Sequence, residues 1–302
     1  MDISLIGVPM YLGAGRRGVD MGPSAIRYAS IREKLTKLGH TVKDLGSVPV
    51  PEPTAPPAPD EPLKYLDEVV CVANELAKRV EGVMRAGSTP IILGGDHSIS
   101  LGSASGVANA VQSPGIIWFD AHTDFNTSKT SPSGNIHGMI LGALCGYGDP
   151  EVGDPALVNV AGGGPHIDAR RVVVVGARDI DPGERELLKR SGVHVFTMTD
   201  IDRLGMDRVT RDAIALASEG APGIHISFDL DGVDPKDAPG VGTPVPGGMT
   251  WREAHLAMEL VADSGKLLSL DLVEVNPILD EHNRTADLAA QLALSATGKR
   301  IL

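Results

Sequence analysis

The sequence has few cysteines, few aromatic residues and no long apolar run. Its two cysteines, Cys71 and Cys145, lack the spacing of a metal site, and a lone structural disulfide is rare in a reducing compartment. We therefore expect both to be packing residues. Aromatic residues make up only 3%, so the core must consist mainly of Val, Ile, Leu and Ala. No run of about 18 apolar residues occurs, and the first residues do not follow the pattern of a signal peptide. We expect no membrane span and a cytoplasmic location.

Basic residues are also scarce relative to acidic ones. The chain has 27 Lys and Arg against 39 Asp and Glu, a formal net charge of −12. This balance disfavours nucleic acid as a partner, because phosphate binding needs clustered Lys and Arg. It would favour the approach of a cationic ligand, although solubility alone can account for it.

Short runs rich in β-branched residues alternate with longer segments of helical periodicity. Several runs are apolar throughout, which is typical of strands buried on both faces of a parallel sheet. Thr250 and Glu253 form a capping box that predicts a helix start. The pattern predicts a single α/β domain over residues 1–302, with Pro51–Pro62 as an exposed loop. The predicted strands are Ile3–Ile6, Thr41–Leu45, Pro90–Leu93, Ile116–Phe119, Val172–Val175, Val193–Phe196, Ile224–Leu230 and Leu267–Val273.

Four polar motifs directly follow or close predicted strands. They are GGDHS at 94–98, DAHTD at 120–124, DLDGVD at 229–234 and EVNP at 274–277. In a doubly wound sheet, ligands bind outside the carboxyl ends of the strands. The sequence therefore predicts a convergent site of acids and histidines.

The acids and histidines of these motifs have the pattern of metal ligands. DAHTD places potential ligands at alternate positions, which leave an extended chain on the same face, and Asp229 and Asp231 repeat that spacing. Converging acids without a cation would repel one another and raise their pKa values. Each motif alone is often only a turn or a helix cap, so the metal prediction depends on their combination. Oxygen donors with two imidazoles and no thiolate favour Mn²⁺ over zinc or copper, without excluding Fe²⁺ or Co²⁺.

The chain resembles the arginase family, within the wider ureohydrolase group. The resemblance implies a three-layer α/β fold with a central, mainly parallel sheet of about eight strands, and a homotrimer or homohexamer. The stretch NTSKTSPSGNIHG is most specific to arginases. The sequence departs from bacterial arginases at Tyr11, where an acid is common, and in the glycine-rich stretch 152–166. The matching segments are GVDMGPSAIR, GGDHSIS, DAHTDFNT, SPSGNIHGM, ARDIDPGE, SFDLDGVDP, APGVGTPVPGG and EVNPILDEHNRTA, which run from Gly18 to Ala286.

The resemblance also implies two manganese ions per subunit. Positions that match the family ligands of one ion are His97, Asp120, Asp124 and Asp229. Those that match the ligands of the other are Asp120, His122, Asp229 and Asp231. Asp120 and Asp229 would therefore bridge the pair.

The implied reaction is hydrolysis of L-arginine to L-ornithine and urea. Two adjacent cations lower the pKa of a bridging water far enough to give hydroxide, which would attack the guanidinium carbon. Glu274 matches the residue that pairs with the guanidinium, and Asp124 would relay a proton to the leaving amine. His137 matches the proton shuttle or general acid, a role that suits an imidazole. Thr243 is expected to hydrogen-bond near the guanidinium end.

A second group of residues matches the positions that bind the amino-acid end of arginine. Asn126, Ser131 and Ser133 match the carboxylate-binding positions, and Asp181 and Glu184 match the acids near the ammonium group. The same acids also fit a helix start, with an Asp cap, Pro next and Glu at the third position. The residues alone favour the cap, but one residue can do both.

Three alternatives remain at this stage. A related guanidine hydrolase, acting on agmatine or a guanidino acid, would share the metal site. Agmatine lacks the carboxylate and would not need Asn126, Ser131 or Ser133. A degenerate, inactive member is disfavoured because every ligand position is present, along with His137 and Glu274. A deacetylase on a similar fold would have a single-zinc ligand set, which this sequence does not resemble.

Overall fold

The computed structural model describes residues 1–149, 151, 154–163 and 167–302. All eight predicted runs form strands of one sheet, in the order β2-β1-β3-β8-β7-β4-β5-β6. Every pair of neighbouring strands is parallel. The strands are β1 Asp2–Val8, β2 Thr41–Ser47, β3 Thr89–Gly94, β4 Gly115–Phe119, β5 Val172–Ala177, β6 His194–Thr197, β7 Ile224–Asp229 and β8 Leu267–Val273.

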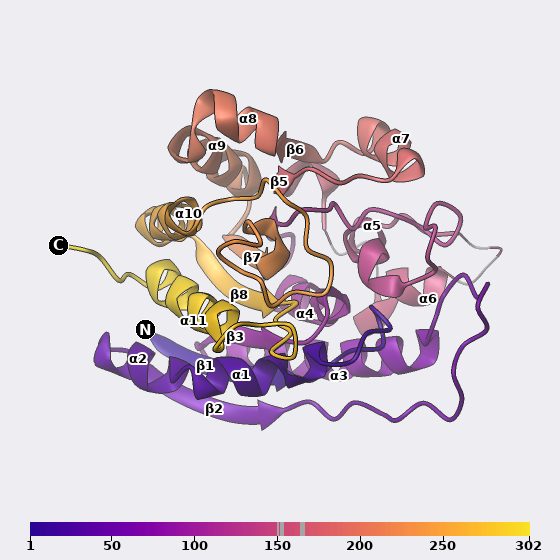
Figure 1. Ribbon diagram of the computed structural model, residues 1–302, viewed down its shortest axis with the longest axis horizontal. Coiled ribbons are helices and arrows are strands. Elements are labelled where there is room, and N and C mark those ends of the chain that lie inside the picture. The colour runs from indigo at the N-terminus through magenta and orange to yellow at the C-terminus, as the bar shows by residue number, and fades with distance from the viewer. Residues whose placement is uncertain (150, 152–153, 164–166) are drawn as a thin grey trace.

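Helices cover both faces of this sheet, which confirms the predicted three-layer α/β fold (Figure 1). The α-helices are α1 Gly22–Tyr28, α2 Ile31–Lys37, α3 Leu66–Arg85, α4 Ser100–Val111, α5 Ile140–Leu144, α6 Pro155–Val158, α7 Pro182–Ser191, α8 Met198–Leu204, α9 Met206–Ser218, α10 Trp251–Ser264 and α11 Arg284–Ala296. Short 3-10 turns are η1 Val19–Met21, η2 His97–Ile99, η3 Ile136–Met139, η4 Val160–Gly162, η5 Ala169–Arg171 and η6 Leu230–Gly232. The capping box of Thr250 and Glu253 opens α10, as predicted.

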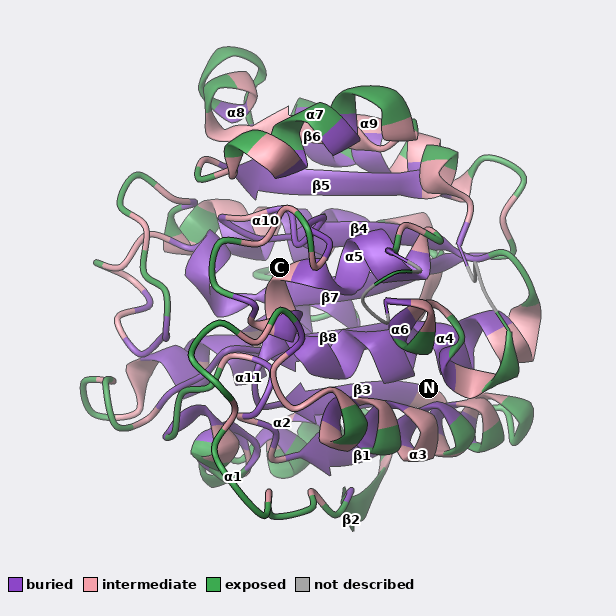
Figure 2. Ribbon diagram, turned by 90° about the vertical axis from the view of Figure 1, so that its right-hand side faces the viewer, coloured by how far each residue is buried: buried purple, intermediate pink, exposed green. Residues whose placement is uncertain are grey.

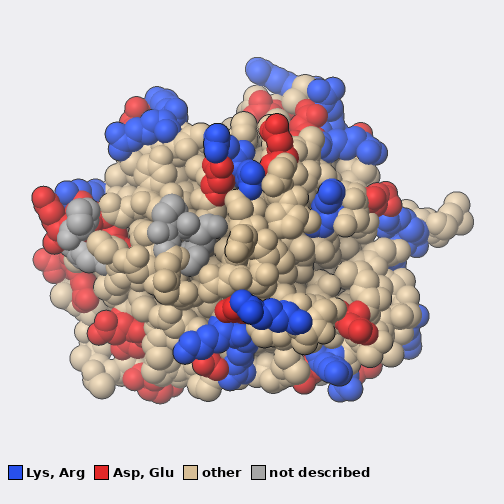
Figure 3. Space-filling view, turned by 180° about the vertical axis from the view of Figure 1, so that it is seen from behind, with Lys and Arg blue, Asp and Glu red and all other residues tan. Residues whose placement is uncertain are grey.

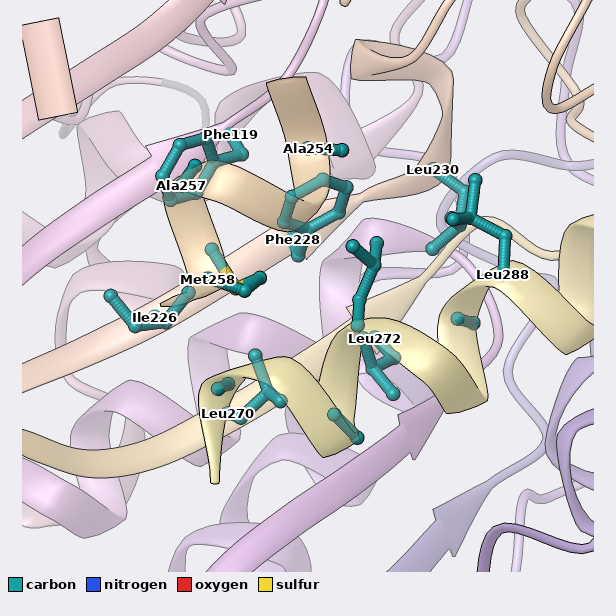
Figure 4. Close-up of a cluster of buried hydrophobic side chains, with 14 of the residues drawn as sticks. Phe119, Ile226, Phe228, Leu230, Ala254, Ala257, Met258, Leu270, Leu272 and Leu288 are labelled. Carbon is teal, nitrogen blue, oxygen red and sulfur yellow. The ribbon is translucent and has the colours of Figure 1, made fainter. Parts of the chain in front are cut away.

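The side chains of β4 divide between two apolar clusters that lie on opposite faces of the sheet. In β4, Ile117 and Phe119 join the cluster formed with α9, α10 and α11, while Ile116 and Trp118 join the cluster formed with α3 and α4. Figure 4 shows part of the first cluster, where the rings of Phe119 and Phe228 stack with centroids 5.2 Å apart. The central strands are therefore buried on both faces (Figure 2). This is why β4 and β5 consist almost entirely of apolar residues.

Several smaller predictions can be compared with the structure. Pro51–Pro62 lies outside every helix and strand and is mostly exposed, as expected. Both cysteines are free, but Cys71 is exposed on the outer side of α3, so its prediction as a packing residue was wrong. Cys145 is partly buried, and burial raises the pKa of its thiol to about 12.

The two departures from the family pattern are Tyr11 and the stretch 152–166. Tyr11 accepts a hydrogen bond from Arg17 at 3.2 Å, and the guanidinium carbon lies 4.9 Å from the centre of its ring. The tyrosine thus binds a cation where an acid is common. Of the stretch 152–166, the structure describes 154–163, which form α6 and η4, and residues 152, 153 and 164–166 lie outside the described part.

The surface carries charges of both signs. Basic and acidic side chains are interspersed over the face shown in Figure 3. Within the described residues, no helix combines the length and apolarity needed to cross a membrane.

Candidate active site

The four polar motifs come together because their strands are neighbours. β3, β8, β7 and β4 are consecutive in the sheet and parallel, so their carboxyl ends meet at one edge. Beyond β4 the chain bends at once rather than staying extended. The bend is held by Asp120, whose Oδ1 accepts the backbone N–H of His122 at 2.7 Å. Asp229 makes the same turn after β7 by accepting the N–H of Asp231 at 2.7 Å.

The first group of candidate ligands surrounds the ring of His97. Its Nδ1 lies 3.1 Å from Asp120 Oδ2, 3.2 Å from Asp124 Oδ2 and 3.1 Å from Asp229 Oδ2. All four side chains are buried. Asp124 reaches this position with a φ of 46°, a left-handed conformation that a residue other than glycine seldom adopts.

The second group surrounds His122. Its Nδ1 lies 3.3 Å from Asp120 Oδ1 and 3.2 Å from Asp231 Oδ2. Asp120 therefore directs one carboxylate oxygen to each group. Asp229 lies in the first group through Oδ2, and its Oδ1 accepts the N–H of Asp231 in the turn after β7.

The electrostatics of these groups call for a cation. Burial, together with the neighbouring Asp231 and Asp120, raises the pKa of Asp229 well above its ordinary value. Burial and Asp120 likewise raise the pKa values of Asp124 and Asp231. A cation between the carboxylates would remove this repulsion.

The donor atoms also fit a divalent metal. The buried Nδ1 of His97 has no hydrogen-bond partner among the described residues, although it faces three carboxylate oxygens. Oxygen-rich sites with imidazole suit Mn²⁺ and similar ions. The residues present therefore fit a divalent metal at each of the two groups, as the family resemblance implies.

Two further side chains hold the candidate ligands in place. Trp118 donates its indole N–H to Asp120 Oδ2 at 2.9 Å, and its ring stacks on that of His97 at 3.9 Å. Thr243 donates its hydroxyl to Asp231 Oδ2 at 2.9 Å, a contact that the sequence did not predict for it. Supporting contacts of this kind orient metal ligands. Trp118 was not predicted from the sequence, although a buried indole N–H needs an acceptor and Asp120 is two residues away.

Glu274 and His137 form a buried pair beside the first group. Glu274 Oε1 accepts the backbone N–H of His97 at 2.9 Å and lies 3.2 Å from His137 Nδ1. Burial by itself lowers the pKa of His137, but Glu274, followed by Asp124 and Asp96, outweighs it and raises the pKa to about 9. The imidazole is therefore protonated near neutral pH and can act as an acid.

A cavity of about 220 Å³ opens over the two groups. It brings together most of the predicted site residues and adds Asp179, which was not predicted although it lies in the matching segment ARDIDPGE. Its lining consists of His122, Asp124, Asn126, His137, Asp179, Asp181, Glu184, Asp229, Asp231 and Thr243.

The residues predicted for the amino-acid end divide into two sets. Asn126 donates its amide to Asp181 Oδ2 at 2.9 Å, and both residues line the cavity. Ser131 and Ser133 instead accept backbone N–H groups of their own loop, at 3.1 and 3.2 Å. They are not part of the cavity lining.

The predicted helix cap at Asp181 is confirmed. Asp181 and Glu184 form a capping box at the start of α7. Glu184 is buried, and its Oε1 also accepts the backbone N–H of Phe125 at 2.7 Å. Burial raises the pKa of this carboxyl to about 7.

Arg178 fixes the loops around the second group and was also missed. Its guanidinium donates to the carbonyl oxygens of Asp231 at 2.7 Å, Gly232 at 3.1 Å and Val245 at 2.7 Å. It therefore ties the turn of Asp231 to the loop that carries Thr243. A run of carbonyl partners leaves no pattern in the sequence.

Comparisons with known proteins agree with this geometry. Residues 1–298 match the model of the arginase family. The chain is 53% identical to an arginase of Brevibacillus brevis, over 100% of this chain and 99% of that protein. It is 50% identical to an arginase of Bacillus subtilis strain 168, over 99% of each chain. The solved structure of an arginase from Bacillus caldovelox is 48% identical, with a TM-score of 0.95 over 100% of this chain and 99% of that one.

The matches extend over the whole fold and over every motif of the site. They confirm the family predicted from the sequence and the prediction of a hydrolase. The chain belongs to the arginase family.

Proposed function

We propose that this chain hydrolyses L-arginine to L-ornithine and urea at a centre that binds two Mn²⁺ ions. The observation that carries the proposal is the position of Asp120. One of its carboxylate oxygens lies 3.1 Å from His97 Nδ1, and the other lies 3.3 Å from His122 Nδ1. One ion would be held by His97, Asp120, Asp124 and Asp229. The other would be held by Asp120, His122, Asp229 and Asp231.

The chain's own residues would orient the substrate and move the protons. Bound divalent ions would supply the acidity that turns water into a nucleophile near neutral pH. Guanidinium is delocalised and permanently charged, so it must be held in place to react. Glu274 is assigned to that task, because it is a buried carboxylate beside His137. Asp124 would relay the proton of the nucleophile to the leaving amine, and the protonated imidazole of His137 would act as the proton shuttle or general acid.

The cavity has the charge that a cationic substrate requires. Asp179 and Asp181 line it beyond the candidate metal ligands. We assign the ammonium group of arginine to Asp181 and Glu184, and the carboxylate to Asn126, Ser131 and Ser133. The two serines would act through water, because their hydroxyls are held by their loop. Thr243, whose hydroxyl donates to Asp231, would use its hydroxyl oxygen to accept a hydrogen bond near the guanidinium end.

The competing proposal is a hydrolase of agmatine or a guanidino acid on the same centre. Urea release from L-arginine and from agmatine at equal concentration, with added Mn²⁺, separates the two. We expect faster turnover of arginine, because agmatine offers no carboxylate to Asn126. Faster turnover of agmatine would rule out arginine as the preferred substrate.

We also propose that residues 1–302 act as one catalytic domain, as the family resemblance implies. The protein would assemble as a homotrimer or homohexamer and work in the cytoplasm, with the small molecule L-arginine as its partner. Nucleic acid and membranes are not proposed as partners, since the acidic balance of the chain disfavours the first.

A further inference from the structure

A second polar cluster lies behind the first group of candidate ligands, on the side away from the cavity. It includes His225 and Ser227 of β7, Ser100 of α4, and Asp271 of β8, all of them fully buried. The two strands bring it together, because Ser227 and Asp271 are register partners. The sequence carries a signal for it: IHISFD and LLSLDLV alternate polar and apolar residues in strands buried on both faces.

The cluster forms a continuous chain of hydrogen bonds that begins at His97. His97 Nε2 lies 2.7 Å from Ser227 Oγ, and Ser227 Oγ lies 3.1 Å from Ser100 Oγ. The Ser100 hydroxyl donates to Asp271 Oδ2 at 2.7 Å. The chain therefore connects a candidate metal ligand to a buried carboxylate that touches neither the cavity nor either metal group.

The direction of these hydrogen bonds is set at the carboxylate end. A carboxylate only accepts, so Ser100 gives its single proton to Asp271. Ser100 must then accept from Ser227, which leaves the Ser227 oxygen as the acceptor for the N–H of His97 Nε2. The proton of the neutral imidazole is thereby held on Nε2, and the lone pair of Nδ1 points at the three carboxylates.

We propose that Asp271 is a positioning residue for the metal centre. Acting through Ser100 and Ser227, it selects the tautomer of His97 that can ligate a metal. Without the Ser100 oxygen as its acceptor, Ser227 could donate its proton to Nε2 of His97 instead. That would stabilise the tautomer with a proton on Nδ1, and a protonated Nδ1 cannot bind a metal. The inference rests on the proposed function, because it needs a metal at His97.

Ser103 offers a matched control on the same helix. Its hydroxyl also donates to Asp271 Oδ2 and is fully buried, but it lies off the path to His97. Ser100→Ala breaks the path, whereas Ser103→Ala removes a hydrogen bond of the same kind to the same oxygen. A merely structural role of the cluster would make the two variants equivalent.

The test is calorimetric titration of the metal-free wild type, Ser100→Ala and Ser103→Ala with Mn²⁺, with urea unfolding as the measure of folding. We expect Ser100→Ala to weaken the binding of one of the two ions by about tenfold, the lower end of the usual range for a supporting contact. Ser103→Ala should bind both ions as the wild type does. Ser100→Cys, which keeps the shape but donates weakly, should fall between Ser100→Ala and the wild type, and it replaces Ser100→Ala if that variant does not fold.

Equal affinities in all variants, or equal losses in Ser100→Ala and Ser103→Ala, would overturn the role of Asp271 and leave the proposed metal centre standing. A wild type that bound no Mn²⁺ would overturn this role together with the proposed metal centre.

Discussion

Asp120→Ala is expected to abolish the binding of both metal ions and, with it, turnover of arginine. Asp120 is the one residue whose oxygens face both His97 and His122, at 3.1 and 3.3 Å, in the part of the chain that the structure describes. Losing a supporting contact costs roughly 10- to 100-fold in metal affinity. Losing a ligand shared by two ions should cost far more. The measurement is the metal content of purified protein after dialysis against Mn²⁺, together with urea release.

Asp231→Ala is the matched variant for this prediction. Asp231 faces only His122, so its loss should lower the occupancy of one ion and spare the other. Urea unfolding checks that Asp120→Ala is folded, because the variant also loses the acceptor of the His122 backbone N–H and of the Trp118 indole N–H. If Asp120→Ala kept two ions and full activity, the ligand assignment would be wrong.

Glu274→Gln is expected to lower kcat/KM severely and to lower the pKa of His137. Losing one partner of a desolvated, hydrogen-bonded charge pair in a complex typically costs about 2 kcal/mol or more, which corresponds to roughly 30-fold. Glu274 is the main group that raises the pKa of His137 to about 9, against an ordinary value of 6.5. Without it, the imidazole should lose its proton at lower pH. The basic limb of the pH profile should then move to lower pH.

The pKa shift can be measured apart from activity, by NMR titration of the histidines in the metal-free protein. His255 serves as an internal control, since it contacts Ser295 at 2.8 Å and its pKa is lowered chiefly by burial. Its titration should be unchanged in Glu274→Gln. An unchanged titration of His137 would contradict the pairing with Glu274.

The strands could be predicted from the sequence because burial on both faces leaves a direct pattern. Short runs that are apolar throughout, such as IIWF and VVVV, are typical of strands buried on both faces of a parallel sheet. The convergence of the motifs was also predictable, because parallel strands present their carboxyl ends together. The strand order β3-β8-β7-β4 was not predictable. No local sequence pattern indicates that β8 lies between β3 and β7, which both precede it in the chain.

The finer roles at the site depend on side-chain directions, which a sequence does not contain. The structure shows that the Thr243 hydroxyl donates to Asp231, while its expected contact near the guanidinium stays a prediction. It shows that Ser131 and Ser133 accept N–H groups of their own loop, while their expected contact with the substrate carboxylate stays a prediction. The helix cap at Asp181 was predictable because capping is a matter of local spacing.

The central claim is that two metal ions, held by groups that share Asp120, are required for arginine hydrolysis. The most direct test is urea release from L-arginine by metal-stripped protein as Mn²⁺ is added in measured equivalents per chain. We expect little activity without metal and a rise that saturates when two equivalents are bound. Full activity in the stripped protein, or saturation at a single bound ion, would contradict the account.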